Sequence, residues 1–505
     1  MKPTLLAAAL TSLFIAAPAT AETFSFTPLW TYNHASTGVA GMTSEVPAFD
    51  AVTNTLWLAG SAGVDVLDAT NGTLVQHIDT SGWGLINSVA ISNGLAAFAI
   101  ENVNRTQSGV VTLFDTSTRS LISGTNTIAV GALPDMLTFT PDGSRLLVAN
   151  EGTPDVYGSR IGTSTPRIYA PAANDPIGSV SIIDVASRSV IATPTFDSAP
   201  QSGSYIRTNT GMNFEPEYIA VNAAGTQAFV GLQEANAMGV IDLNTNTVTK
   251  VIGLGAKDFS LPGNTFDPKN DGTVNFINAD VKGLYMPDSM ATYQVGTQTY
   301  VVMANEGDFR EDDGDRSAAS TLGATDPLNA LRISNTDSFA DNLVAAGARS
   351  FSIRDSNGNI VFDSGDILDR EAHALGIYND GRSRDKGVEP EGVALIEIDG
   401  RTFAFIGLER TTQSAVAVFD ITDPANSSFI DMIVTNGTFA PEGLTAYSYG
   451  GRHFLAVANE ANIDGGILGT TALYEISAPV PEPASYAMLL AGLGLIGVAV
   501  RRRRR

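Results

Sequence analysis

The stretch from residue 388 to residue 421 reads VEPEGVALIEIDGRTFAFIGLERTTQSAVAVFDI. An acid-proline-acid turn at 389–391 leads into one apolar run, a turn at Asp399 and Gly400 leads into a second, and an acidic loop at Glu409 leads into a third. Each run is short, rich in β-branched and aromatic residues, and bounded by turn-forming residues, which is typical of strands and not of helices. The stretch therefore predicts a three-stranded β-meander.

The same arrangement recurs along the chain, and a looser fourth apolar run follows several of the copies. The six further copies cover 46–69, 86–116, 133–185, 213–243, 286–308 and 440–476. One such sheet cannot cover its own apolar faces, whereas seven sheets packed radially can. We therefore expect an all-β fold, a seven-bladed β-propeller with loop insertions. An array of β-sandwich domains is the alternative, but Greek-key strands would not repeat one turn motif in this way.

The predicted propeller spans residues 22–478. The apolar run at 24–32 precedes the first copy, and the last copy lacks an outer strand of its own. We expect the run at 24–32 to fill that place and so to close the ring.

The longest insertion in the predicted propeller covers 309–387. Within it, the Ala- and Leu-bearing segment 327–348 predicts a helix that Asp326 caps, with Pro327 in the first helical position. The segment 350–365 contains an Asn-Gly pair between two apolar runs, which predicts a hairpin. We expect this hairpin to supply the outer strands of the fifth blade.

Composition limits the possible functions. The chain has 505 residues, no cysteine, and 53 acidic against 29 basic residues, for a net charge of −24. The absence of cysteine excludes disulfides and thiolate metal sites. The strong negative charge argues against nucleic acid and anionic membrane surfaces as partners, and it favours cations.

The N-terminal segment 1–21 has the pattern of a signal peptide. Lys2 precedes an apolar stretch, and Ala19 and Ala21 form a small-x-small cleavage site. The sequence therefore predicts an exported protein.

The C-terminal segment 479–505 contains Pro481, Glu482 and Pro483, then an apolar stretch and five arginines. This tail resembles the PEP-CTERM sorting signal of Gram-negative bacteria, which an exosortase recognises and removes. The resemblance implies transient retention in the inner membrane and then transfer to the cell surface or the extracellular matrix. A plain C-terminal anchor is the alternative, since the apolar stretch is just long enough to span a bilayer.

In a propeller blade, the turn that leads into the first strand and the loop between the second and third strands open on the same face. We call these the leading turn and the second loop. Acids occupy both positions in most copies. The leading turns carry Asp135, Glu215, Glu217, Asp288, Glu389, Glu391 and Glu442. The second loops carry Glu101, Glu151, Glu234, Glu306, Asp308, Glu409 and Glu460. Because first strands line the central channel, these acids should gather around its mouth.

Many carboxylates at such close range need compensation, because like charges a few ångströms apart cannot all remain ionised. We expect a divalent cation, with calcium as the first choice, since it binds six to eight oxygen ligands. The candidate ligands are the acids above except Glu101 and Glu234, and Asn150, Asn305 and Asn459 could add amide oxygens. The alternative is structural: the proline stiffens each leading turn, and the acid caps free backbone N–H groups.

Two further acidic segments resemble ion-binding loops less closely. The segment 308–315 could wrap an ion or could be a solvated charge run. The segment 267–272 resembles the start of a calcium loop, but Lys269 stands at a ligand position, so it is not expected to be an EF-hand.

No nucleophile elbow and no phosphate-binding glycine loop occur in the sequence. The candidate catalytic residues are Arg310, Arg410 and His373, since a metal ion flanked by arginines is suited to phosphate esters. The alternative to a non-catalytic binding module is therefore a metal-dependent phosphoesterase.

Several long segments resemble one family across nearly the whole predicted mature chain. LPDMLTFTPDGSRLLVANEG, FEPEYIAV, ANEGDFRED and VEPEGVAL are similar to motifs of the choice-of-anchor I family of bacterial surface propellers. That family is related to mesenchyme-specific cell-surface glycoproteins and to proteins labelled alkaline phosphatase. Phe309 departs from the pattern, which has a small residue at that place. The resemblance implies a surface propeller, but it brings no catalytic residues that can be carried over. We expect extracellular polysaccharide or surface proteins as partners.

Overall fold

The computed structural model describes residues 24–122, 127–154, 175–207, 214–309, 315–460 and 468–477. The predicted signal peptide and the predicted sorting tail lie outside these residues. Within them, no helix has both the length and the apolar character that crossing a membrane requires.

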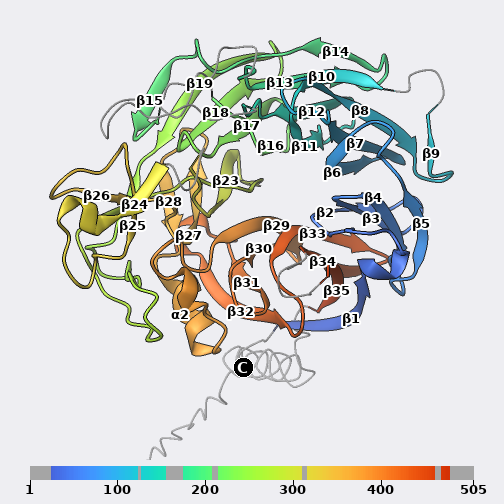
Figure 1. The fold of residues 1–505 in the computed structure, drawn as a ribbon. Coiled ribbons are helices and arrows are strands. Elements are labelled where there is room, and N and C mark those ends of the chain that lie inside the picture. The colour runs from blue at the N-terminus through green and yellow to red at the C-terminus, as the bar shows by residue number, and fades with distance from the viewer. Residues whose placement is uncertain are drawn as a thin grey trace, which may run out of the picture.

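The described residues form seven successive sheets of four or five strands, which we call blades 1 to 7 (Figure 1). Blade 1 holds β2 (Val46–Asp50), β3 (Thr55–Gly60), β4 (Gly63–Asp68) and β5 (Leu74–Ile78). Blade 2 holds β6 (Leu85–Ser92), β7 (Leu95–Glu101), β8 (Ser108–Asp115) and β10 (Ile128–Ala132), with β9 (Ser120–Leu121) also beside β8. Blade 3 holds β11 (Pro134–Phe139), β12 (Arg145–Asn150), β13 (Ser179–Asp184) and β14 (Ser189–Ala192).

The remaining blades follow the same order from the axis outwards. Blade 4 holds β16 (Ile219–Val221), β17 (Gln227–Leu232), β18 (Ala237–Asp242) and β19 (Thr247–Leu254), with β15 (Gln201–Ser204) parallel to β19. Blade 5 holds β22 (Met290–Val295), β23 (Gln298–Asn305), β27 (Ser350–Asp355) and β28 (Ile360–Asp363). Blade 6 holds β29 (Pro390–Ile398), β30 (Arg401–Leu408), β31 (Ser414–Asp420) and β32 (Ser428–Thr435). Blade 7 holds β33 (Pro441–Tyr449), β34 (Arg452–Asn459), β35 (Thr470–Ser477) and β1 (Ser25–Asn33).

The first strands form a closed ring around the axis. Each of them contacts the first strand of the next blade, and β33 contacts β2. Apolar side chains fill the space between blades; between blades 1 and 2, for example, Trp57 packs near Phe98, which stacks on Phe114 with ring centroids 4.7 Å apart. The predicted all-β propeller fold is confirmed.

The N-terminal strand β1 closes the ring as predicted. It pairs antiparallel with β35, from Ser25 opposite Ser477 to Asn33 opposite Thr470. A short 3-10 helix, η1 (His34–Thr37), follows directly and carries a buried histidine.

The side chain of His34 joins blade 7 to blade 1. Its Nδ1 lies 2.7 Å from Asp65 on β4, and its Nε2 lies 2.8 Å from the hydroxyl of Thr471 on β35. Asp65 also accepts a hydrogen bond from His77 on β5, at 2.7 Å. His34 and Asp65 are both fully buried, so these bonds form where an unpaired polar group is costly.

The long insertion differs from the prediction in one part and agrees in another. The predicted helix at 327–348 is wrong: this segment holds β25 (Arg332–Ser334) and β26 (Leu343–Ala345). Its apolar residues bury separately in a small core around Phe259 and Phe266, so that tertiary packing decides the conformation. The predicted hairpin is confirmed, because β27 and β28 form the outer strands of blade 5.

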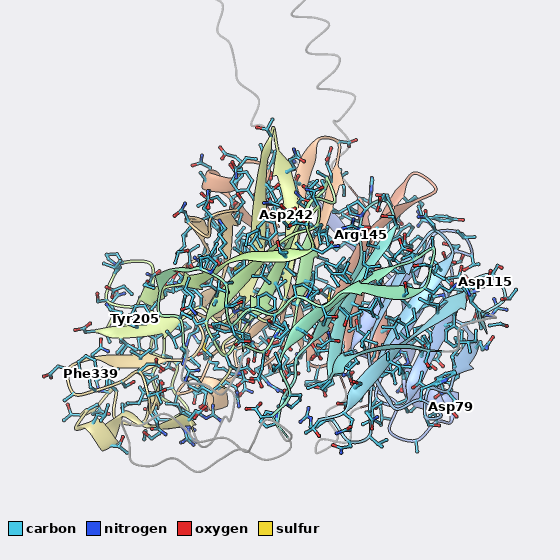
Figure 2. The ribbon with its side chains drawn as sticks, turned by 90° about the horizontal axis from the view of Figure 1, so that it is seen from above. Asp79, Asp115, Arg145, Tyr205, Asp242 and Phe339 are labelled. Atoms are coloured by element: carbon cyan, nitrogen blue, oxygen red, sulfur yellow. The ribbon has the colours of Figure 1, made fainter. Side chains whose placement is uncertain are left out.

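The rest of the insertion, together with residues 256–284, forms a lobe beside blades 4 and 5 (Figure 1). It contains two small sheets, β20 (Ala256–Asp258) with β21 (Val281–Leu284) and β26, and β24 (Arg316–Ala318) with β25. The helical segments are η2 (Ala319–Leu322), α2 (Ile367–Ala374) and η3 (Asp380–Arg382), and η4 (Pro424–Asn426) lies in blade 6. In the view of Figure 2, Phe339 of the lobe and Asp79 of blade 1 lie at opposite edges of the molecule.

Replacing His34 with alanine should destabilise the protein by about 3 kcal/mol, because Asp65 and Thr471 lose a buried partner. Denaturant unfolding of the purified chain measures this loss. His453→Ala is the matched control, because the ring of His453 bonds the hydroxyl of Ser448 at an exposed site, and a much smaller effect is expected there. Equal losses in the two variants would contradict a special role for the link between blades 7 and 1.

Candidate metal centre

A repeated backbone hydrogen bond brings the two kinds of acid together at the mouth of the channel. In four blades the residue before the proline of the leading turn is left-handed, with φ between 41° and 52°: Leu133, Met286, Glu389 and Ala440. Their carbonyl groups accept hydrogen bonds of 2.8 to 3.0 Å from the N–H groups of Glu151, Gly307, Glu409 and Glu460. A left-handed conformation is uncommon for residues other than glycine. This strained turn therefore fixes each leading turn against the second loop of its own blade.

The channel itself contains a cavity of about 500 Å³. At the leading-turn end its wall includes Glu45, Asp135, Asp288 and Glu442, from blades 1, 3, 5 and 7. Acids from different blades therefore lie together at one mouth of the channel, as the sequence predicts.

The acids form groups in which one carboxylate oxygen from each of three residues lies within 4.8 Å of the others. The groups are Glu391, Glu409 and Glu442; Asp288, Glu306 and Glu391; Glu306, Glu389 and Glu409; and Glu151, Glu217 and Glu234. Glu391 belongs to two of them. It is 8% exposed, and its Oε2 atom has no hydrogen-bond partner among the described residues.

Burial and mutual repulsion raise the pKa values of these acids strongly. Burial, together with the charges of Glu151 and Glu45, raises the pKa of Asp135 from 3.8 to about 8. Burial and the neighbouring acids hold the pKa values of Asp288, Glu391 and Glu442 well above their usual range. Burial raises the pKa of Glu409 to about 7, although a hydrogen bond with Glu391 opposes the shift. Without a cation, these groups therefore tend to hold protons at neutral pH.

A second repeated acid occurs at the opposite end of the blades and behaves differently. The third strand of six blades ends in an aspartate whose carboxylate accepts a hydrogen bond from a backbone N–H of the following turn. These residues are Asp68, Asp115, Asp184, Asp242, Asp355 and Asp420. The hydroxyl of Ser117 lowers the pKa of Asp115, and that of Ser187 lowers the pKa of Asp184.

The acids of the mouth do not have that capping role. In the described part of the chain, no backbone N–H donates to the carboxylates of Asp135, Asp288, Glu391 or Glu442. The structural alternative, in which these acids cap free N–H groups, therefore fits the turn aspartates and not these four. Asn150 and Asn305 are structural as well: their amides bond serines of the third strand within the same blade.

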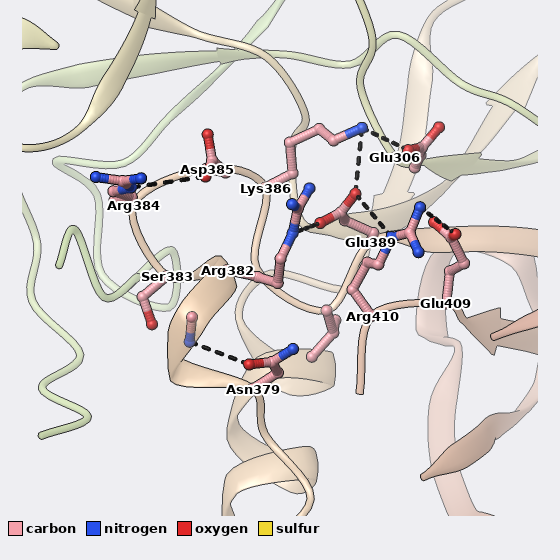
Figure 3. A network of polar contacts seen from close by, with 12 residues as sticks. Glu306, Asn379, Arg382, Ser383, Arg384, Asp385, Lys386, Glu389, Glu409 and Arg410 are labelled. Atoms are coloured by element: carbon pink, nitrogen blue, oxygen red, sulfur yellow. Dashed lines mark hydrogen bonds and ion pairs between the residues drawn. The ribbon is translucent and has the colours of Figure 1, made fainter. Parts of the chain in front are cut away.

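Cationic side chains compensate one sector of the mouth, between blades 5 and 6 (Figure 3). The ammonium of Lys386 lies 2.6 Å from Glu306 and 3.2 Å from Glu389. Arg382 lies 2.6 Å from the other oxygen of Glu389, and Arg410 lies 2.6 Å from Glu409. Burial alone would raise the pKa of Glu389, but Lys386 and Arg382 together lower it.

The backbone holds Lys386 in this place. Arg349, itself buried, lies within hydrogen-bonding distance of the carbonyls of Ser383 and Asp385, and the N–H of Val388 donates to Asp369. Burial opposes the charge of Lys386, but Glu306 and Glu389 hold its pKa well above its usual range. The fixed ammonium therefore compensates the charge of Glu306 and Glu389 in this sector.

The structure brings most of the predicted ligands together. Those at the mouth are Asp135, Glu151, Glu217, Asp288, Glu306, Glu389, Glu391, Glu409 and Glu442. Glu460 raises the pKa of Glu442 by its charge, and Asp308 does the same for Glu234. Glu215 is buried in the leading turn of blade 4 and belongs to none of the groups within the described residues.

The candidate catalytic residues lie in different parts of the molecule. Arg410 lies at the mouth, paired with Glu409. His373 lies on α2, where its exposed ring packs against Phe276 and Tyr378 and not against the acids. Arg310 and the processing residues Ala19, Ala21, Pro481, Glu482 and Pro483 lie outside the described residues.

Sequence reasoning missed Lys386 and Glu45, and it left Glu234 out of the candidate ligands. Glu45 stands two residues before Pro47 and not beside it, so it did not match the acid-proline motif. Lys386 precedes Glu389 by three residues, and this spacing was the one available signal.

The calcium-like segment 267–272 contains its own counter-ion. Lys269 lies 3.7 Å from Asp271 and also pairs with Asp326. Asp267 accepts hydrogen bonds from the backbone N–H groups of Lys269 and Asn275. This loop is therefore built as a self-contained turn, in keeping with the expectation that it is not an EF-hand.

The fold and the site together define a β-propeller whose central channel has an acidic mouth. The chain belongs to the choice-of-anchor I domain family, whose model matches residues 45–424. The PEP-CTERM protein-sorting motif matches residues 479–504. This motif marks the chain as an exported surface protein that an exosortase sorts, as in Gram-negative bacteria.

Among curated proteins, none matches this chain. Among solved structures, it is similar to hydrazine synthase of Kuenenia stuttgartiensis, with 11% identity over 87% of this chain and 96% of that chain and a TM-score of 0.48. It is also similar to a chain of the mitotic checkpoint complex, with 12% identity over 94% of this chain and 99% of that chain and a TM-score of 0.48.

Lys386→Met should destabilise the protein by about 3 kcal/mol at pH 7, because it leaves buried carboxylates without their partner. The pKa of Glu389 is 4.5 in the unfolded chain and lower in the folded protein. The ion pairs of Glu389 therefore stabilise the folded state at pH values above 4.5, and this contribution disappears as the pH falls through the folded-state pKa. The difference between variant and wild type should therefore shrink as the pH falls below 4.5 and Glu389 takes up a proton. Denaturant unfolding at several pH values measures it.

Arg384→Met is the control for the lysine variant. Arg384 lies in the same loop, but its side chain is more exposed and its contact with Asp385 is long, at 3.9 Å. We therefore expect a smaller loss of stability with little pH dependence. A loss for Lys386→Met that does not change with pH would contradict the charge-pairing explanation.

The metal-free protein should lose stability as the pH rises from about 4 to about 8. The reason is that a carboxyl whose pKa is raised in the folded state, such as Asp135 from 3.8 to about 8, binds its proton more tightly there than in the unfolded chain. Urea unfolding in the presence of a chelator measures this slope. Asp135→Asn removes one of the responsible groups, so its slope should be flatter; an unchanged slope would show that the loss arises elsewhere.

Proposed function

We propose that this protein is a surface binding module whose channel mouth holds a divalent cation, with calcium as the expected ion. The observation that carries the proposal is the buried carboxylate of Glu391, which lies in two groups of three acids and keeps one oxygen without a partner among the described residues. A buried carboxylate is unfavourable in its charged form unless an ion or a donor compensates it.

The ligand atoms suit calcium, which binds six to eight oxygens at about 2.3 to 2.6 Å. In each group around Glu391, one carboxylate oxygen from each acid lies within 4.8 Å of the others, so one ion could contact all three acids. The proposed ligands are Glu391, Glu409 and Glu442, with Asp288 beside them. Glu306 and Glu389 are less suited, because Lys386 already pairs with both.

The proposed ion would do two things for a protein sorted to the surface. It would bind three blades together at the axis, and it would make stability outside the cell depend on dissolved calcium. A matrix polysaccharide or another surface protein is the partner class that suits this location.

The geometry gives less support to a phosphoesterase. An enzyme of that kind needs arginine or lysine side chains that face a substrate across the metal site. Among the described residues, Arg382, Lys386 and Arg410 are instead each paired with acids. Chelator-sensitive hydrolysis of phosphate mono- and diesters would overturn this preference.

Calcium should raise the stability of the full chain by about 2.7 kcal/mol at a concentration one hundred times its dissociation constant. In the double variant Glu391→Gln, Glu442→Gln this gain should be lost. Glu475→Gln is the control, since Glu475 pairs with Arg452 at an exposed site and should leave the gain intact. Calorimetric titration measures the dissociation constant of calcium, and thermal unfolding measures the gain in stability.

Two results would contradict the proposal. If no divalent cation binds the wild-type chain, the acidic mouth is not a metal site. If the double variant binds calcium as tightly as the wild type does, the ion lies elsewhere.

A further inference from the structure

The cavity in the channel has a polar end and an apolar wall. Glu45, Asp135, Asp288 and Glu442 mark its acidic end. Further along, Val89, Leu137, Val393 and Leu444 form the wall, and the ring of Tyr447 lies stacked on Phe49 with centroids 3.7 Å apart. Asp135, Met136, Leu444 and Tyr447 are only partly buried, so solvent reaches the space. A cavity of about 500 Å³ is within the usual range for small-molecule sites.

The charge in this cavity is uncompensated on the side of blades 1 and 3. Among the described residues that line the cavity, none is lysine or arginine. The described cations Arg382, Lys386 and Arg410 pair with Glu389, Glu306 and Glu409, in the sector of blades 5 and 6. An ion at Glu391 and Glu442 would leave Glu45 and Asp135 unneutralised. Glu45 and Asp135 therefore need a proton or a cationic group of their own, with or without the proposed ion.

An independent observation also points to a ligand in the channel. Ser88 lies on the cavity wall in blade 2, is 1% exposed, and its hydroxyl has no hydrogen-bond partner among the described residues. Blade 2 has no acid in its leading turn; Asn87 stands there and donates to the carbonyl of Pro134. Buried hydroxyl groups normally have a partner, so the place beside Ser88 is suited to a polar group of a bound molecule.

We infer that the channel binds a small molecule that carries a protonated primary amine on an apolar stem. The ammonium would lie between Glu45 and Asp135, where three N–H donors can meet carboxylate oxygens and the hydroxyl of Ser88. The stem would lie against Leu137 and Leu444, with its far end near Tyr447. A bare metal ion would leave the apolar wall uncovered, and a neutral or anionic molecule would leave the acids uncompensated.

The test is calorimetric titration of the full chain with 2-phenylethylamine, and with 2-phenylethanol as the neutral probe of the same shape. Each is titrated once in saturating calcium and once in chelator. The amine should bind in both conditions, and the alcohol should bind at least tenfold more weakly. Amine binding that is retained in chelator is independent of the metal, so failure of the ion site and failure of this inference give different results.

Three variants locate the amine. Asp135→Asn should weaken binding at least tenfold by removing the charge, and Ser88→Ala should weaken it several-fold. Ala90→Leu fills the partly buried wall of the channel without changing a charge, and it should abolish binding. Glu475→Gln, on the outer part of blade 7, should have no effect.

Two outcomes overturn the inference: equal binding of amine and alcohol, or amine binding that survives both Asp135→Asn and Ala90→Leu. Thermal unfolding of each variant shows that it is folded, and Asp135→Asn is expected to be at least as stable as the wild type in chelator near pH 8.

Discussion

Electrostatic repulsion at the channel mouth is the constraint on which the rest of this structure depends. Every first strand begins next to the axis, so an acid in one leading turn meets acids from the other blades. The backbone bond from the second loop to the leading turn adds another acid from the same blade. Folding therefore gathers charge that the unfolded chain keeps apart. The chain compensates one sector with Lys386, Arg382 and Arg410, and the remaining acids require protons or an external cation.

The chain repeats acids at two positions of the blade, and the two positions have different structural roles. The aspartates at the ends of the third strands accept backbone hydrogen bonds, as Asp115 and Asp242 do. They are part of the blade's own construction and need nothing from outside. The acids of the leading turns recur in five blades, but Asp135, Asp288 and Glu442 line a shared cavity, and burial raises the pKa of Asp135. The two kinds of acid are distinguished by whether a backbone N–H donates to the carboxylate. Their regular recurrence in the sequence does not distinguish them.

The sequence predicted those parts of the structure that local sequence patterns control. Strand order, the gathering of acids and the closure by β1 follow from the repeat, because blade geometry is fixed by short-range alternation and turns. The insertion was harder to predict. Residues 327–348 lack a helix because Leu331 and Leu343 bury in a small separate core. Lys386 reaches the mouth only because Arg349 and Asp369 hold its loop. His373 lies away from the mouth for a related reason, since α2 packs on the outside of blades 5 and 6.

The pairing of β1 with β35 has a mechanical consequence for a tethered protein. The segment that matches the sorting motif starts at residue 479, two residues after β35 ends. While the chain is held by that segment, a pull enters the propeller through β35. This strand is bonded along its length to β34 on one side and to β1 on the other. A pull along the strand would load these bonds together in shear, so the strand that closes the ring also protects the attached protein against being unravelled from its tether.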